Sequence, residues 1–385
     1  LGFRIMASST PNQQQQLSNM YGATAAPPPT PSTQPNNLLY TSDAADALSR
    51  ILHRFPPALS LPTRCSPEVT CPPVISISDQ NPTLLDDVLT ASSQLGFFQL
   101  TDHSIHSRLA SLAESESLAL FDLPDDKKES YFPKNWPLGY EGADDEDGDG
   151  LGESFRLESS CSAELSLDSL REFTGALEKL GLRIIELLSK AVGFENPIEE
   201  DPTRFHSLMW ISEALPGNKS IMAGGFYPYI VCMQYQIRYQ KYSLLADSGW
   251  VSVLPQVDSV MVTLGDIAHV WSNGKLKKVR GRAMAHLGDT NNKKKKNNSR
   301  CVSMSLLLTL PVDSKVSSLL PKPIGGNDQE KDEQQIQTDG STCREHEQEQ
   351  EEIRSKFNSF CFEDYAWRAY HERLLFKDPL DRYRI

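Results

Sequence analysis

The spacing of hydrophobic residues predicts helices and two short strands over the first half of the chain. Residues 83–93 and 168–192 have apolar side chains at helical spacing, and residues 74–77 and 96–100 have the composition of strands. One face of the longer helix carries Leu170, Phe173, Leu177, Leu180, Ile184, Leu187, Leu188 and Val192. This half of the chain therefore predicts a helical region that leads into the rest of the fold.

From residue 207 onward the helical spacing ends and short β-rich runs replace it. These runs cover 229–239, 250–254, 260–264 and 301–310. The last run alternates, so that one side carries Val302, Met304, Leu306, Leu308 and Leu310. Helices followed by many short strands favour a barrel or jelly roll. We therefore predict a mainly β fold with α elements, a double-stranded β-helix (jelly roll) core with an N-terminal helical region and a C-terminal helix.

Two segments lack the pattern of a folded core. Residues 5–42 contain no charged side chain and are rich in Gln and Pro, so they bury too little apolar surface to offset ordering entropy. Residues 327–352 hold ten acidic residues against two basic ones, a net charge of −8. We expect a disordered tail (1–42), an N-terminal region (43–160), a long helix plus jelly-roll core (161–324), an acidic disordered linker (325–356) and a C-terminal helix that docks on the core (357–385).

Composition narrows the classes of partner and compartment. The chain has 385 residues, with 38 Lys and Arg against 51 Asp and Glu, and this acidic balance provides no attraction to nucleic acid or anionic membranes. No apolar run approaches the about 20 residues that cross a bilayer. The seven cysteines include no Cys-x-x-Cys pair, which argues against a disulfide scaffold or zinc module. We expect a monomer in the cytoplasm, or also in the nucleus, without membrane or nucleic-acid partners.

Short motifs follow one another along the chain in a consistent order. They lie at 73–77, 95–105, 121–124, 249–253, 264–266, 272–274, 362–365 and 380–385. This series resembles plant 2-oxoglutarate and Fe(II)-dependent dioxygenases of the isopenicillin N synthase-like type, and Glu153-Ser154-Phe155-Arg156 is similar to a segment of gibberellin oxidases. The resemblance covers residues 70–385 apart from the acidic linker. It implies a jelly-roll oxidoreductase that uses Fe(II) and 2-oxoglutarate.

The resemblance also implies an iron site, formed by His-x-Asp on one strand and a distal His on another. A gap-free count from Trp250 places the first His at Gly224, the Asp at Phe226 and the distal His at Gly281. None of these residues binds iron, and no His-x-Asp triplet occurs anywhere in the sequence. We therefore expect the triad to be missing, and we expect Phe226 to point inward and fill the former metal position.

Four histidines are candidates for substitute ligands. His206, His269 and His286 lie in or near the strand region, and His103 lies in the N-terminal region. His286 follows Gly281 by an odd number of residues, so in a regular strand it faces the opposite side. We interpret all four as structural or surface histidines.

The family clamps 2-oxoglutarate with an Arg-x-Ser pair on one strand face. The nearest match here is Arg300-Cys301-Val302-Ser303, which is one residue longer, so Arg300 and Ser303 face opposite ways in a regular strand. Arg300 and Ser303 remain weak candidates for 2-oxoglutarate binding, since a guanidinium pairs strongly with a carboxylate on its own. A surface charge at the end of a strand is the alternative for Arg300.

Two charged segments complete the candidates. Asp145-x-Asp147-x-Asp149-Gly150 is similar to the start of a calcium loop, but its twelfth position is Arg156 instead of Glu, so we expect no calcium site. Residues 275–300 hold ten basic residues against Asp289 alone. We interpret this segment as a solvated loop that the acidic linker neutralises, and a nuclear-import signal or a patch for an acidic partner is the alternative.

Two functions remain open at this point. The first is a member of the dioxygenase family that lacks a functional iron site, has no cofactor and acts as a non-catalytic binding or regulatory protein for an unknown small molecule or protein partner. The second is an active oxidoreductase, similar to gibberellin oxidases, that hydroxylates a small molecule with Fe(II) and 2-oxoglutarate through unrecognised ligands. The residues at the triad positions favour the first function.

Overall fold

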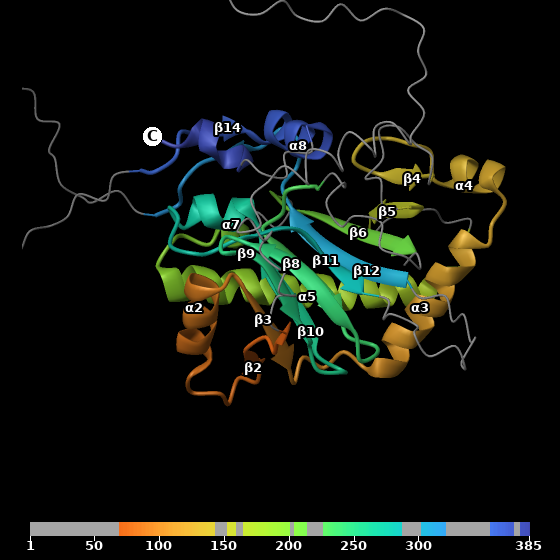
Figure 1. Cartoon of the computed structure of the whole chain (residues 1–385), viewed down its shortest axis with the longest axis horizontal. Coiled ribbons are helices and arrows are strands. Elements are labelled where there is room, and N and C mark those ends of the chain that lie inside the picture. Colours follow the sequence, from red (N-terminus) through yellow and green to blue (C-terminus); the bar gives the residue numbers. More distant parts are fainter. Residues whose placement is uncertain are drawn as a thin grey trace, which may run out of the picture. The chain divides into compact units, whose positions relative to one another are not determined.

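Two β-sheets pack face to face, with helices on the outer side of the larger one (Figure 1). The computed structural model describes residues 69–142, 152–158, 165–200, 204–213, 226–286, 302–320, 355–372 and 378–385, all within one unit, Cys65–Ile385. The predicted tail and the acidic linker up to residue 354 lie outside these described residues. In the described part, no helix is long and apolar enough to cross a membrane.

The larger sheet combines strands from the whole described chain. Its order is β2 (Val74–Ser76), β3 (Phe97–Thr101), β10 (Val260–Leu264), β7 (Val231–Tyr235), β12 (Val302–Thr309), β6 (His206–Glu213), β5 (Ser154–Glu158) and β4 (Gly139–Glu141). The smaller sheet has the order β1 (Val69–Thr70), β9 (Gly249–Val253), β8 (Lys241–Ala246) and β11 (Val279–His286). A short pair, β13 (Lys315–Val316) and β14 (Phe360–Cys361), lies apart from both. The predicted mainly β fold with helices is confirmed.

The described helices flank the sheets and connect their strands. They are α2 (Leu84–Gln94), α3 (Ser107–Phe121), α4 (Asp125–Tyr131), α5 (Asp168–Val192), α6 (Pro197–Glu200), α7 (Asp266–Trp271), α8 (Phe362–His371) and the 3-10 helix η2 (Pro379–Tyr383). The helix α5 has the predicted bounds and crosses behind the strands (Figure 1). It lies directly on the sheet, because a Cβ added to Gly181 would be 2.5 Å from side-chain atoms of Met233 and Leu308.

The two faces of the larger sheet have different neighbours. Met233 and Leu308 face α5, and Met304 contacts Ser117 of α3, so the alternating apolar side predicted for β12 packs against the helices. The opposite face, which we call the barrel interior, faces the smaller sheet. At the β3 and β10 end, this interior is filled by an apolar cluster of Phe97, Tyr242, Leu244, Ala246, Val253, Met261, Val279 and Ala283.

A buried lysine joins the smaller sheet to the C-terminal segment. Lys278 Nζ lies 2.7 Å from Asp266 Oδ1 and 2.6 Å from Asp378 Oδ1, and its side chain is 0% exposed. Tyr365 of α8 donates a hydrogen bond to the other oxygen of Asp266. The sequence interpretation of 275–300 as a solvated loop is therefore wrong for Lys278, because two carboxylates surround this ammonium group inside the protein.

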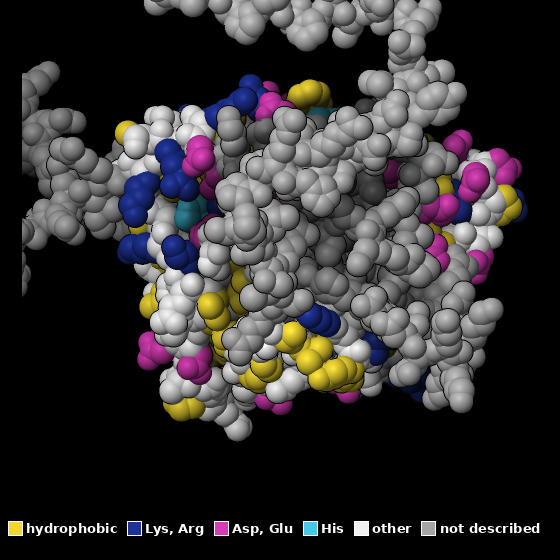
Figure 2. Space-filling model, viewed as in Figure 1, with side chains coloured by type: hydrophobic (Ala, Val, Ile, Leu, Met, Phe, Trp, Pro, Cys, Tyr) yellow, Lys and Arg dark blue, Asp and Glu magenta, His cyan; other side chains and the backbone are white. Residues whose placement is uncertain are grey.

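Two other lysines of the basic segment agree with the interpretation as a solvated loop. Lys275 and Lys277 are exposed. Figure 2 shows basic side chains gathered at the left, near α7, and acidic side chains at the right, over α4. The segment is therefore a mixture of surface lysines and buried cations.

We expect Lys278→Met to lower the free energy of unfolding by about 3–5 kcal/mol, because removing one partner leaves buried carboxylates without their counter-charge. The exposed neighbour provides the matched control, and Lys277→Met should change stability by less than about 0.5 kcal/mol. Urea denaturation of both variants at neutral pH measures the difference. Equal effects of the two substitutions would show that the buried ion pairs do not hold this segment.

The same ion pairs predict a dependence of stability on pH. Burial raises the pKa of Asp378, but the positive charges of Lys278 and Arg280 outweigh burial and hold this pKa below its ordinary value. A carboxyl with a depressed pKa stabilises the fold above its unfolded pKa of about 4, and this contribution is lost as the pH falls further. The wild type should therefore lose more stability between pH 5 and about 3 than Asp378→Asn, measured by urea denaturation at each pH.

Candidate functional site

The positions that the gap-free count assigned to the family's Asp and distal His meet in the fold. Phe226 lies just before β7, and Gly281 lies in β11 of the facing sheet. A Cβ added to Gly281 would lie 3.6 Å from Cβ of Phe226. Two residues that are far apart in sequence thus lie close together in the fold. Gly224, assigned to the first His, lies outside the described residues.

A bulge shapes the strand at Gly281. Arg280 pairs with Leu245 and Met284 pairs with Ser243, so three residues of β11 lie opposite Leu244 alone. Gly281 has φ of +68°, a left-handed conformation that favours glycine. The backbone at Gly281 therefore departs from a regular strand, and glycine also has no side chain that could bind a metal.

Tyr229 fixes this bulge from the larger sheet. Its hydroxyl donates to the carbonyl oxygens of Val279 and Gly281, at 2.9 and 2.8 Å, and lies 3.1 Å from Thr263 Oγ1. Burial raises the pKa of Tyr229 well above its ordinary value, so the hydroxyl keeps its proton. Tyr229, which sequence reasoning missed, is a buried side chain that spans the interior at the level of Gly281.

The residues described at this position do not fit an Fe(II) site. Phe226 and Gly281 have no donor atom for a metal, and in the described part of the chain no three His, Cys, Asp or Glu side chains are grouped to hold one. Phe226 itself is half-buried. The expectation that Phe226 points inward and fills the metal position stays a prediction.

Two of the candidate histidines have structural roles. His269 of α7 is buried, with Nδ1 2.6 Å from the carbonyl oxygen of Leu276, and burial lowers its pKa. His103 has Nε2 2.9 Å from the carbonyl oxygen of Asp258, while its Nδ1 accepts from the backbone of Ile105. Both interactions hold loops in place, in agreement with the structural interpretation.

The other two histidines lie at strand ends. His206 is the first residue of β6, where its Nε2 lies 3.6 Å from Glu158 Oε1. His286 is the last residue of β11 and pairs with Lys241, at the opposite end of the bulge from Arg280. Among the described residues, His206 belongs to no group that could hold a metal ion.

Trp210 of β6 lies in the barrel interior with a guanidinium group against its ring. Arg282 Cζ is 4.0 Å from the ring centroid, and Arg282 Nη1 donates to Ser212 Oγ at 3.1 Å. Arg282 belongs to the smaller sheet, so its half-buried side chain reaches across the interior from the bulge at Gly281. The sequence interpretation of the basic segment as a solvated loop is wrong for this residue too.

A second arginine approaches the same ring from β5. Arg156 Cζ is 5.3 Å from the Trp210 ring, and the guanidinium pairs with Glu141 at 3.1 Å, where both side chains are 1% exposed. Tyr370 of α8 donates to Glu141 and accepts a hydrogen bond from Arg156. The C-terminal helix therefore contacts the core through the hydrogen bonds of Tyr370 to this buried ion pair.

Of the two residues proposed to bind 2-oxoglutarate, the structure describes one. Ser303 faces the barrel interior and accepts a hydrogen bond from Gln234 Nε2 at 3.1 Å, and the same nitrogen donates to Ser305 Oγ. Arg300, like the aspartates of the calcium-like motif, lies outside the described residues. What the sequence predicts for Arg300 and for the calcium-like motif therefore stays a prediction.

The spacing of residues along β5 and β6 could have predicted the interior residues that sequence reasoning missed. Ser154 and Arg156 are two positions apart, as are Trp210 and Ser212, and side chains two apart share one face of a strand. The strands pair Arg156 with Trp210 and Ser154 with Ser212. We name the set of Arg156, Trp210, Ser212 and Arg282 the interior cluster.

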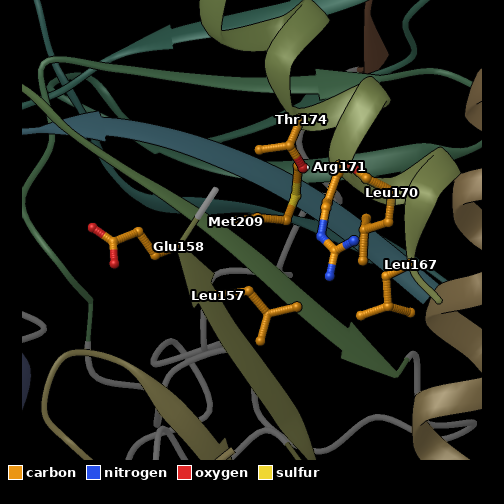
Figure 3. Close-up of a pocket in the computed structure, with 7 residues that line it drawn as sticks. All are labelled: Leu157, Glu158, Leu167, Leu170, Arg171, Thr174 and Met209. Carbon is orange, nitrogen blue, oxygen red and sulfur yellow. Dashed lines mark hydrogen bonds between the residues drawn. The ribbon is translucent and has the colours of Figure 1, made fainter. Parts of the chain in front are cut away.

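A small cavity lies on the other face of the same strands. Figure 3 shows its lining: Leu157, Glu158, Leu167, Leu170, Arg171, Thr174 and Met209. Its volume is about 290 Å³ including its opening to solvent, and Glu158 points away from the other side chains (Figure 3). A cavity of this size with a largely apolar lining falls below the usual range for a small-molecule site.

The comparisons with known proteins agree with this fold. Residues 72–171 match the family model described as non-haem dioxygenase in morphine synthesis N-terminal. Gibberellin 2-beta-dioxygenase 8 of Arabidopsis thaliana is 24% identical over 56% of this chain and 69% of its own length. Codeine O-demethylase of Papaver somniferum is 23% identical over 60% of this chain and 68% of its own.

Solved structures show the same architecture. The crystal structure of JOX2 in complex with 2OG, Fe and JA has a TM-score of 0.59 at 16% identity, and covers 83% of this chain and 90% of that one. The dioxygenase for auxin oxidation in rice has a TM-score of 0.52 at 19% identity, and covers 81% and 99% respectively. The family-model match and the relatives in sequence, together with this shared fold, support the 2-oxoglutarate/Fe(II)-dependent dioxygenase superfamily for this chain.

Proposed function

We propose that the chain is a non-catalytic binding or regulatory member of this superfamily, with no Fe(II) at the triad position. The proximity of Phe226 and Gly281 carries the proposal, because the gap-free count assigns these two residues to the positions where the chemistry needs a carboxylate and an imidazole. Neither residue supplies a ligand atom. Without the metal, the fold keeps a barrel interior for binding and lacks the centre that activates dioxygen.

The left-handed backbone at Gly281 adds a second argument. A residue with a Cβ adopts φ of +68° only at a conformational cost, so an imidazole at this position is disfavoured by the backbone as well as by the present side chains. The backbone at Gly281 thus opposes a metal ligand in addition to the missing side chain. Restoring one side chain does not rebuild the site.

The alternative is an active oxidoreductase that uses Fe(II) and 2-oxoglutarate. It is favoured by the names of the relatives, which include gibberellin 2-beta-dioxygenases and a codeine O-demethylase. Metal binding separates the two functions directly, because the superfamily's oxygen chemistry requires the iron.

We expect anaerobically purified protein to contain no stoichiometric iron and to show no binding of Fe(II) at micromolar concentration in calorimetry, because Phe226 and Gly281 provide no ligand. A relative with an intact triad, purified and titrated in the same way, is the control. One tight site per chain would overturn the proposal. Substitution of His206, His269 and His286 in turn would then identify the ligands.

We expect Gly281→Ala to lower the free energy of unfolding by about 1–2 kcal/mol, because alanine is strained in the left-handed conformation. The space itself is sufficient, since the nearest atom is 3.6 Å away. Gly175 of α5 is the matched control, because it is helical with no atom within 4 Å, and Gly175→Ala should stabilise by about 0.5–1 kcal/mol. Urea denaturation measures both, and a neutral Gly281→Ala would contradict the bulge geometry.

A further inference from the structure

One face of α8 presents a tryptophan to solvent. Trp367 is 52% exposed, which makes it the most exposed of the five tryptophans in the chain. Tryptophan is highly buried on average, because its ring is large and apolar. It is also enriched among the residues that carry most of the binding energy of protein interfaces. This helix face is therefore a candidate surface for a partner.

A histidine supports the exposed ring. The ring centroids of Trp367 and His371 are 4.5 Å apart, with an angle of 24° between the ring planes. His371 Nδ1 lies 2.9 Å from the carbonyl oxygen of Trp367, and its ring lies 6.0 Å from that of half-buried Trp136. We call Trp367 and His371 the aromatic platform. Rings that are already held in place lose little conformational entropy when a partner binds.

Two carboxylates stand one helical turn before the platform. Glu363 and Asp364 precede Trp367 by four and three residues, so both are its neighbours on the helix surface, and both are exposed. Arg368 of the same helix is half-buried, and its Nη1 donates to the hydroxyl of Tyr383 at 3.5 Å. This guanidinium is thus held by η2, while negative charge flanks the platform.

Rings and carboxylates together suit a cation. The face of an aromatic ring attracts a positive charge, and tryptophan does so most strongly. A guanidinium matches both parts of the surface, because it stacks flat on a ring and its planar fork pairs with a carboxylate. The protein itself contains the first of these contacts, since Arg282 Cζ lies 4.0 Å from the centroid of the Trp210 ring. The surface therefore matches arginine better than lysine.

The position of the platform favours a polypeptide over a small molecule. Small-molecule sites are concave, whereas the platform lies on an exposed helix face, where Figure 2 shows hydrophobic and histidine side chains at the top of the view. Trp136, which contacts His371, lies in the loop after α4, and acidic side chains gather over α4 (Figure 2). The net charge of the chain, −13, also attracts a basic partner.

We propose that the aromatic platform binds an arginine in a basic segment of a partner protein. The guanidinium lies on the exposed part of the Trp367 ring, and the carboxylates of Glu363 and Asp364 accept its hydrogen bonds. This inference goes beyond the proposed function, because it concerns the outer surface of α8 and depends on neither the presence nor the absence of iron.

The test measures binding of labelled peptides to the full chain by fluorescence anisotropy. A peptide of alternating arginine and glycine is compared with versions in which lysine or citrulline replaces every arginine, and with an uncharged proline-rich peptide. Citrulline keeps the shape of arginine without its charge. We expect the arginine peptide to bind most tightly and the lysine peptide about threefold or more weakly. The citrulline and proline-rich peptides should not bind.

Trp367→Ala is the decisive variant, because it removes the ring and leaves every charge of the chain in place. We expect it to weaken binding of the arginine peptide by about fivefold or more, since a cation–π contact is lost. Trp250→Ala is the matched control, because Trp250 of β9 is 37% exposed and lies outside the platform. This control should bind the arginine peptide as the wild type does.

A second pair of variants tests the carboxylates. Glu363→Gln combined with Asp364→Asn removes both charges from the first turn of α8, and we expect weaker binding of the arginine peptide. Asp86→Asn combined with Asp87→Asn removes two exposed charges from the first turn of α2 and should leave binding unchanged. The melting temperature of each variant shows whether it is folded, and the carboxylate pair decides if Trp367→Ala is not.

The outcomes separate this inference from the proposed function. If the wild type does not bind the arginine peptide, or if Trp367→Ala binds it as tightly, the platform is not the site. Equal affinity for the lysine peptide would overturn the assignment to arginine, and tighter binding of the proline-rich peptide would assign another class of partner. Iron content is measured on the same preparation, so bound iron would overturn the proposed function while the peptide result stands.

Discussion

The bulge in β11 is the constraint on which the interior of this protein depends. Gly281 in a left-handed conformation lets the strand carry extra residues. The Tyr229 hydroxyl binds the carbonyl groups of Val279 and Gly281. The bulge brings Gly281 to Phe226 and Arg282 to Trp210. The backbone of Tyr229 in turn lies very close to Gly265. A Cβ added to Gly265 would lie 2.0 Å from the carbonyl oxygen of Tyr229, so glycine is required there.

Two groups of buried charges among the described residues bind the C-terminal segment to the core. One is the pair of Arg156 with Glu141, which Tyr370 completes, and the other is Lys278 between two aspartates. Buried ion pairs offset a large desolvation cost and contribute little net stability, but they tolerate few alternative arrangements. Their role is therefore to fix where α8 and Asp378 lie against the sheets.

The sequence predicted the elements better than the interior. Hydrophobic spacing located α5 and β12 because a packed face repeats over many residues. Residues 226 and 281, which the gap-free count assigned to two triad positions, lie close together in the structure. The sequence did not predict the inward position of Lys278 and Arg282. A run of basic residues has the pattern of a solvated loop, and this pattern does not show that single residues of the run point into the protein. A bulge adds residues without a periodic signal, so the roles of Tyr229 and Arg282 became visible only in the structure.

The order of strands in the larger sheet has a consequence for how the molecule folds. Its central pairs join distant parts of the chain, as Leu100 pairs with Val260, and the contact of Tyr370 with Glu141 spans 229 positions. Closing such long loops costs entropy before any contact forms, so chains dominated by non-local pairs fold slowly. The local turns of α5 form early, whereas the barrel interior, with its bulge and buried charges, is complete only when β11 and α8 have both arrived.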